Sequence, residues 1–220
     1  VIPPSWRPDL KIPEDLVEEI ARLFGYKNIP SQKPEFLDYN YLSIKEDNQE
    51  IINKIKRLLV SRNIMEIISW SFVDSKFQDI FKTEKIVRIQ NPISTELDSL
   101  RSNLLINLLK IVKNNNNKNI KNCSIFEIGP IFNGYEPGEQ LDFISIIRSG
   151  QMYEKNWIEK DRVFDIFDVK ADLFSILKNI GFNNEIFKQS NESENYYHPG
   201  KSGSISLGNK KIATFGELHP

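Results

Sequence analysis

Four carboxylates lie close together near the start of the chain. They are Asp9, Asp15, Glu18 and Glu19. Residues three and four apart share one face of a helix, so three of the four would be neighbours on a helix spanning them. Hard divalent cations such as Mg²⁺ bind several oxygen ligands, and Mg²⁺ usually keeps some waters. The pattern therefore allows a magnesium site, and it equally allows acids that stabilise a helix N-terminus through the helix dipole.

The segment that follows Asp9 has the pattern of an amphipathic helix. Apolar residues recur at helical spacing, namely Leu16, Ile20, Leu23 and Phe24. Pro13 suits the first helical turn, and Gly25 suits the left-handed residue that closes a helix. We predict a helix from about Pro13 to Phe24, followed by an extended linker and a domain boundary near residues 31–40.

Other candidate catalytic motifs fail on spacing or on missing partners. Gly200, Lys201 and Ser202 resemble the end of a phosphate-binding loop, but Asn195 stands where that loop needs its first glycine. His198 could serve as a general base, although a turn histidine before proline is the simpler interpretation. Two histidines and one cysteine are too few for a structural zinc cage.

The bulk composition is that of an ordinary globular domain. The 220 residues carry a formal net charge of -1 and a pI of about 6.2, so no global basic field indicates nucleic-acid binding, while a local basic patch and an RNA partner stay open. The single cysteine, Cys123, suits a reducing compartment, and cytoplasm is the expected location. No apolar run is long enough to cross a membrane. The first and last residues suggest a piece excised from a longer protein.

The remaining sequence mixes helices and strands without strict alternation. Helical patterns occur in EDNQEIINKIKRLLVSRN and DLFSILKNIG, and IMEIISWSFVD has the composition of a buried strand. A helix in NLLINLLKIV should end near Lys113 by propensity, because the Asn run that follows disfavours helix. Short β-rich runs then lead to the end of the chain. This order favours an α+β fold with a mostly antiparallel sheet, and Trp70 is expected in its core.

Seven segments, in order, resemble landmarks of bacterial phenylalanyl-tRNA synthetase beta subunits. They are PSWRPDLKIPEDLVEEIARLFGYKNIP, SWSFVD, NPISTELDSLRSNLL, FEIGPIF, FDVKADL, HPGKSGSISL and FGELHP. The resemblance implies the tail of a winged-helix-like domain at 1–33, a linker at 34–40 and a class II synthetase-like core at 41–220. It further implies an antiparallel sheet flanked by helices, and a helix that continues through the Asn run.

The resemblance also implies a role. In this family the alpha subunit uses ATP to attach phenylalanine to its tRNA, and the beta subunit is catalytically silent. The chain departs from class II catalysis accordingly, because Glu127 has no adjacent arginine in FEIGPIF and FGELHP contains none. We therefore expect a non-catalytic scaffold for alpha subunits in an alpha2-beta2 heterotetramer that acts on tRNA(Phe), with NLLINLLKIV packed against the partner.

By the same resemblance, Asp9, Asp15, Glu18 and Glu19 match the acidic positions of a Mg²⁺ site shared with the alpha subunit. Two alternatives stay open at this stage. One is a free-standing RNA- or protein-binding module derived from a synthetase. The other is a metal-dependent hydrolase built on the acidic cluster, for which the sequence offers no nucleophile or base.

Overall fold

A computed structural model of the chain describes residues 2–32, 48–81, 85–136, 138–153, 157–158 and 161–219. The chain divides into two compact units, Val1–Ile44 and Lys45–Pro220. The linker predicted at 34–40 lies outside the described residues. The predicted domain boundaries therefore stay predictions.

The first unit contains the predicted helix, α1, at Pro13–Phe24. Gly25 closes it at φ +90°, a left-handed conformation that side chains rarely adopt, and its N–H donates to the carbonyl of Ala21 at 2.9 Å. A 3₁₀ turn, η1, follows at Tyr26–Asn28. The apolar stripe of α1 has no buried residue among those described, and Leu23 is 78% exposed. The predicted winged-helix character of this region stays a prediction.

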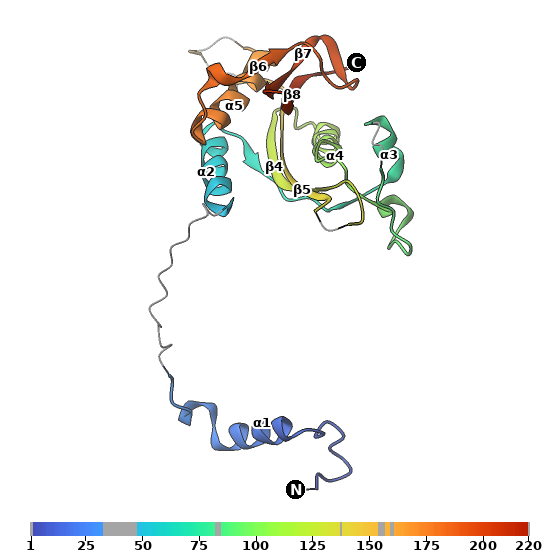
Figure 1. Cartoon of the computed structure of the whole chain (residues 1–220), viewed down its shortest axis with the longest axis vertical. Coiled ribbons are helices and arrows are strands. Elements are labelled where there is room, and N and C mark those ends of the chain that lie inside the picture. The colour runs from blue at the N-terminus through green and yellow to red at the C-terminus, as the bar shows by residue number, and fades with distance from the viewer. Residues whose placement is uncertain are drawn as a thin grey trace. The chain divides into compact units, whose positions relative to one another are not determined.

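The second unit is an α+β body, as the sequence predicts (Figure 1). Its helices are α2 (Asn48–Ser61), α3 (Ser75–Ile80), α4 (Leu105–Asn117) and α5 (Ile166–Asn179), with 3₁₀ turns η2 (Thr95–Leu97) and η3 (Asn184–Ile186). Its strands are β1 (Met65–Glu66), β2 (Phe72–Val73), β3 (Ser99–Leu100), β4 (Cys123–Phe132), β5 (Gln140–Ser149), β6 (Lys188–Ser190), β7 (Tyr197–Leu207) and β8 (Lys210–Leu218). Among the described residues they form sheets β1-β4-β5, β2-β3 and β6-β7-β8. All pairings within these sheets are antiparallel except β1 with β4.

The long β4–β5 pair lies between two helical layers. Successive residues of a strand face opposite ways, and Ile125 packs into a cluster with Leu104 and Leu108 at α4, whereas Phe126 packs with α2 and α5. The same alternation on β5 sends Ile147 to the α4 side and Ile146 to the other. Both faces of this pair are therefore apolar and covered by helices.

Helix α5 also joins this layer to the β6-β7-β8 sheet. Its Leu177 forms a third cluster with Phe187, Ile205 and Phe215, and Ile205 is fully buried. Figure 1 shows α5 beside α2 at one end of the body and beside the β6–β8 strands. One helix thus buries apolar surface against two separate sheets.

Helix α4 corrects two expectations. It continues to Asn117, as the family resemblance implies, and Asn119 closes it in a left-handed conformation at φ 64°. The termination near Lys113 predicted from propensity is therefore wrong, because packing of the apolar face outweighs the weak helix preference of Asn. The leucines of NLLINLLKIV are mostly buried within the unit, so this helix forms the core and its apolar face is not free for a partner.

The segment IMEIISWSFVD is not one buried strand. It contains the two-residue strands β1 and β2, separated by residues 67–71, which belong to no helix or strand. Trp70 is 65% exposed and Ile68 is 90% exposed, so the core position expected for Trp70 is wrong. No helix among the described residues is long and apolar enough to cross a membrane.

Candidate metal site and buried ion-pair networks

Arg7 holds two of the four predicted ligands. Its guanidinium donates to Asp9, with 2.7 Å from Nη2 to Oδ2, and Nη2 also donates to Oε1 of Glu19. Arg22, one helical turn beyond Glu19, donates to the other oxygen of that carboxylate. These hydrogen bonds lower the pKa of Asp9 through Arg7, and they lower the pKa of Glu19 to about 2 through Arg7 and Arg22. The Arg7 guanidinium therefore already bridges the carboxylates of Asp9 and Glu19.

Asp15 acts as a helix cap. Its Oδ2 accepts from the backbone N–H of Lys11 at 2.7 Å and of Ile12 at 3.0 Å, immediately before α1. These two backbone N–H groups lower the pKa of the Asp15 carboxyl, the Ile12 contribution being larger. Capping satisfies amides that a helix start leaves unpaired.

The fourth predicted ligand, Glu18, is exposed on α1. Among the described residues, no group of three or more acidic, histidine or cysteine side chains is arranged to hold a metal. The structure brings Asp9 and Glu19 together on Arg7 and leaves Asp15 engaged with backbone. In this arrangement the four residues do not form a cation cage, and a metal would require Arg7 to release its carboxylates.

A buried ion pair lies in the second unit, where sequence reasoning found none. Arg101 donates from Nη1 to Oε1 of Glu127 at 2.7 Å, and both side chains are 3% exposed. Arg101 also donates from Nε to the carbonyl of Pro130 at 2.9 Å. A Cβ at Gly129 would lie 2.7 Å from Nη2 of Arg101, so this close approach requires glycine. The arginine missing beside Glu127 in sequence is supplied by a distant segment.

This pair holds the segment that follows β1. Ser69 donates to Glu127 from its backbone N at 3.1 Å and from its hydroxyl at 2.6 Å, and Asn107 donates to the carbonyl of Trp70 at 2.6 Å. The backbone N of Arg101 donates to the carbonyl of Ser71 at 2.8 Å. These buried hydrogen bonds fix the backbone of residues 69–71, while the side chains of Ile68 and Trp70 are exposed.

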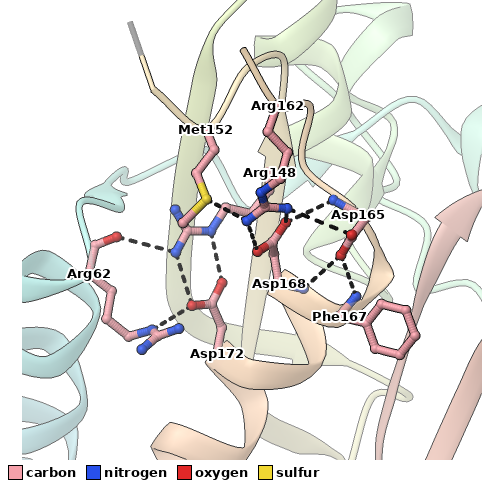
Figure 2. A network of polar contacts seen from close by, with 8 residues as sticks. All are labelled: Arg62, Arg148, Met152, Arg162, Asp165, Phe167, Asp168 and Asp172. Carbon is pink, nitrogen blue, oxygen red and sulfur yellow. Dashed lines mark hydrogen bonds and ion pairs between the residues drawn. The ribbon is translucent and has the colours of Figure 1, made fainter. Parts of the chain in front are cut away.

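A second network joins α2, β5 and α5 (Figure 2). Asp172 on α5 is fully buried and accepts from Nε of Arg62 at 2.6 Å and from Nε of Arg148 at 2.8 Å. Arg148 also donates to the backbone carbonyl of Arg62 at 3.2 Å. One carboxylate therefore connects three elements that are distant in sequence, at a site where losing either charge leaves the other desolvated.

Figure 2 also shows the start of α5, where Nη1 and Nη2 of Arg162 each donate to one carboxylate oxygen of Asp168, both at 2.7 Å. Arg162 lowers the pKa of Asp168. Asp165 caps the helix by accepting from the backbone N–H of Phe167 at 2.8 Å. Most charged and hydrogen-bonding groups in this region are bonded to one another. The two networks therefore hold helices and strands in place and do not present reactive groups.

The rejected motif at residues 198–202 lies in β7, which begins at Tyr197. His198 is therefore in a strand and not in a turn as predicted, and its Nδ1 accepts from the N–H of Gly200 at 3.0 Å. Its ring centroid lies 6.5 Å from that of His219. The backbone here is extended, so it forms no loop that could surround a phosphate.

The fold is similar to that of a solved aminoacyl-tRNA synthetase. A pyrrolysyl-tRNA synthetase from Desulfitobacterium hafniense superposes with a TM-score of 0.57 at 13% identity, covering 79% of this chain and 57% of that one. At this identity the likeness establishes the fold and nothing further.

Sequence comparison narrows the class to one family. The family described as "Phenylalanyl tRNA synthetase beta chain CLM domain" matches residues 29–220, and the tRNA synthetase B5 domain matches residues 1–26. The chain belongs to the phenylalanyl-tRNA synthetase beta chain family, as the sequence landmarks predict.

Curated relatives agree with this assignment along the whole chain. A phenylalanine–tRNA ligase beta subunit of Paramagnetospirillum magneticum is 36% identical over 100% of this chain, and one of Ehrlichia ruminantium is 38% identical over 100%. The chain spans 28% and 27% of the length of these relatives.

Proposed function

We propose that this chain is the portion of a phenylalanine–tRNA ligase beta subunit that scaffolds the alpha subunit in an alpha2-beta2 heterotetramer. In this proposal the alpha subunit carries out the ATP-dependent attachment of phenylalanine to tRNA(Phe). The chain itself binds no ATP. The observation that carries the proposal is the 36% and 38% identity to beta subunits over the full chain.

The buried Arg101–Glu127 pair supports a silent role. Class II catalysis needs cations that are free to meet charge developing on a phosphate. Arg101 is instead 2% exposed and bonded to Glu127 and to the carbonyl of Pro130. A guanidinium with these partners stabilises the fold and is not free to meet charge on a phosphate.

The segment around Trp70 supports the scaffold role. Large apolar side chains that are exposed on a fixed backbone are typical of protein interfaces, in which tryptophan is enriched. Trp70 and Ile68 are exposed, while the network of Glu127 and Asn107 fixes the backbone between them. We place the contact with the alpha subunit here, in place of the α4 surface expected from sequence.

The metal component of the proposal is a Mg²⁺ site at Asp9, Asp15, Glu18 and Glu19, completed by the alpha subunit. Such an ion would supply positive charge that links acidic groups of the two subunits. The positions match the family pattern in type and spacing. Since Arg7 now bonds Asp9 and Glu19, forming the site requires a rearrangement of these side chains.

The test is phenylalanine-dependent exchange of pyrophosphate into ATP. The chain alone, the alpha subunit alone and their mixture are compared, using the longer beta polypeptide of the same source as a reference. We expect no exchange with the chain alone and rescue of alpha activity on mixing. Exchange by the chain alone would refute the silent role, and tight tRNA binding without alpha association would favour an RNA-binding module.

A matched pair of variants locates the interface. Trp70→Ala should weaken association with alpha by about thirtyfold, as for an interface hot spot of about 2 kcal/mol. Trp157→Ala is the control, because Trp157 is 93% exposed and lies in a different segment. Analytical ultracentrifugation of the mixtures measures both. Equal effects of the two substitutions would remove Trp70 from the interface.

A further inference from the structure

The C-terminal end of α4 and the turn that follows it carry a local excess of positive charge. The stretch KNNNNKNIKN, residues 113–122, contains six asparagines and no acid. Its three lysines, which we call the lysine surface, are Lys113, Lys118 and Lys121. No acidic residue occurs between Asp98 and Glu127, although the whole chain has a formal net charge of -1. This end of the helix is therefore basic on a chain that is nearly neutral.

The lysine surface is open to solvent and lacks acidic partners within the described part of the chain. Residues 113–122 are all exposed except Asn115 and Asn122's neighbour in β4, Cys123, marks where burial resumes. Lysines elsewhere are paired, since Lys56 and Lys201 each form an ion pair with a carboxylate. None of the described acids pairs with the lysine surface in this way. Its charges are therefore available to a ligand.

The helix does not need these side chains as caps. The carbonyls of residues 114–116 already accept backbone N–H groups of residues 118–120 at 2.9–3.3 Å. Cations near a helix C-terminus are stabilised by the dipole, but this effect falls off within the last turn. Lys121 lies beyond the last helical residue, Asn117, so the dipole gives it little. Completing the helix end does not account for the three lysines.

The backbone that carries the lysine surface is fixed. Asn119 adopts a left-handed conformation at φ 64° and turns the chain out of α4. Asn122 then accepts from the backbone N–H of Gln151 at 2.9 Å through its side chain. A Cβ at Gly150 would lie 2.5 Å from the carbonyl of Lys121, so the two segments are in close contact. A surface held in this way loses less conformational freedom when it binds a partner.

The lysine surface lies at the opposite end of α4 from the segment proposed to contact the alpha subunit. Asn107, near the start of α4, donates to the carbonyl of Trp70 at 2.6 Å. Asn117 lies ten residues further along the helix, which corresponds to about 15 Å. The two surfaces are therefore separate, and a ligand can occupy one while the alpha subunit occupies the other.

Lysines interleaved with asparagines suit the sugar–phosphate backbone of an RNA. Lysine neutralises phosphate charge, and asparagine amides donate to phosphate and sugar oxygens. A small anion instead requires a concave pocket that buries it, whereas these residues are exposed. Residues 113–122 contain no aromatic side chain that could stack on a base. The chemistry therefore fits contacts with the backbone and not with the bases.

We propose that Lys113, Lys118 and Lys121 contact phosphates of the tRNA that the assembled ligase binds. The inference rests on the proposed function, which makes tRNA(Phe) the substrate of the complex. Phosphate contacts fix the position of a nucleic acid without reading its sequence. The lysine surface thus orients the tRNA, and its contribution to affinity is the same for tRNAs of different sequence.

The first test is the salt dependence of tRNA(Phe) binding to the complex of the alpha subunit with the longer beta polypeptide. The triple variant Lys113→Gln, Lys118→Gln, Lys121→Gln removes three phosphate contacts, each worth about 0.9 in the slope of log affinity against log salt. Between about 50 and 200 mM salt, the wild-type complex should therefore lose about fortyfold more affinity than the variant. A tRNA of another sequence should show the same difference. A difference confined to tRNA(Phe) overturns the proposal.

A matched triple variant controls for net charge. Lys178→Gln, Lys188→Gln and Lys210→Gln change the charge equally at exposed positions on α5 and the β6-β7-β8 sheet. This control should keep the wild-type slope. Equal losses of slope in the two variants, or no loss in the first, overturn the proposal.

Acetylation of lysine amines provides an independent measurement on the wild-type protein. Mass spectrometry compares the reactivity of each lysine in beta alone, in the alpha–beta complex, and in that complex with tRNA(Phe). We expect the lysine surface to become several-fold less reactive only when tRNA is added, with Lys178, Lys188 and Lys210 unchanged. Protection by the alpha subunit alone would identify a subunit interface at this end of α4 and overturn the proposal.

These experiments separate the lysine contact from the function on which it rests. If alpha and beta do not assemble, or the wild-type complex does not bind tRNA(Phe), the proposed function fails and the lysine contact fails with it. If the complex assembles and binds tRNA while the three lysines stay fully reactive, only the lysine contact is overturned.

Discussion

The two units use carboxylates in opposite ways. In the first unit, Asp9 and Glu19 are held on the surface by Arg7, which is close in sequence to Asp9. In the second unit, Asp172 and Glu127 are almost completely excluded from solvent and are held by arginines from distant segments. The first arrangement can be rearranged at small cost, because water screens each charge. The second cannot, because each charge is desolvated.

The surface carboxylates of the first unit can exchange one cationic partner for another. The buried carboxylates of the second unit instead fix the positions of helices and strands. Acids that are clustered in sequence are conspicuous, yet in the structure they are only weakly constrained. Acids that are isolated in sequence, such as Asp172, determine how α2, β5 and α5 meet. The predictions that follow test this contrast, beginning with the buried framework.

Removing Asp172 should have the largest effect. Asp172→Ala leaves Arg148, which is 8% exposed, without its carboxylate partner, and we expect a loss of about 3–5 kcal/mol in the free energy of unfolding. Urea denaturation measures this loss. Asp161→Ala, at an exposed position, is the matched control and should change stability little.

A double substitution distinguishes a lost charge pair from lost packing at this site. Asp172→Leu combined with Arg148→Met replaces the buried ions by apolar groups, which is often close to neutral. We expect it to be more stable than Asp172→Ala. If the double variant is the less stable of the two, burial of the ions themselves stabilises the fold.

The second prediction concerns the network beneath Trp70. Ser69→Ala removes the hydroxyl that donates to Glu127 at 2.6 Å and accepts from Asn107 at 3.0 Å, leaving buried polar atoms with fewer partners. We expect a loss of about 1–3 kcal/mol. Ser71→Ala is the control, because Arg101 bonds the backbone carbonyl of Ser71, which that substitution retains. Equal losses in the two variants would show that the Ser69 hydroxyl has no special role.

Local pattern was enough to predict features that depend on neighbouring residues. Helix α1 has the predicted bounds, and Gly25, at a positive φ, closes it as expected. The α+β class was also predictable. These features follow from periodicity and from backbone conformations that favour glycine, both of which are encoded within a few residues.

Features that depend on tertiary contacts were not predictable in this way. Propensity ended α4 too early, and apolar composition placed Trp70 in the core. The partner of Glu127 was missed because Arg101 is distant in sequence. The pairing of acids with Arg7 was missed although both lie in the same short segment. Sequence spacing identifies which groups lie near one another. It does not identify which of their possible contacts forms.

The third prediction concerns the surface acids and pH. The pKa of Glu19 is lowered from 4.5 to about 2, so the interaction stabilises the unit fully above pH 4.5 and is lost as the pH falls from about 4.5 to 2. We expect the helicity of α1, measured by NMR chemical shifts, to decrease over this range. Glu19→Gln should remove that part of the pH dependence. Glu14→Gln, on the same helix, should leave it in place, and a Glu19 titration near 4.5 would contradict the Arg7 and Arg22 contacts.

The smallest effect is expected for metal binding by the chain alone, where Arg7 and a divalent cation compete for the same oxygens. Arg7→Gln releases both Asp9 and Glu19 from their bridging cation, whereas Arg22→Gln releases only one oxygen of Glu19. We expect Mn²⁺, followed by electron paramagnetic resonance, to bind a few-fold more tightly to the first variant and almost unchanged to the second, because exposed carboxylates gain little from each contact. If Arg7→Gln leaves the affinity unchanged while Glu18→Gln abolishes it, the competition is absent and the ion uses a ligand set that excludes Asp9 and Glu19. Equal affinity in all variants would mean that the acids serve α1 only as its cap and surface ion pairs.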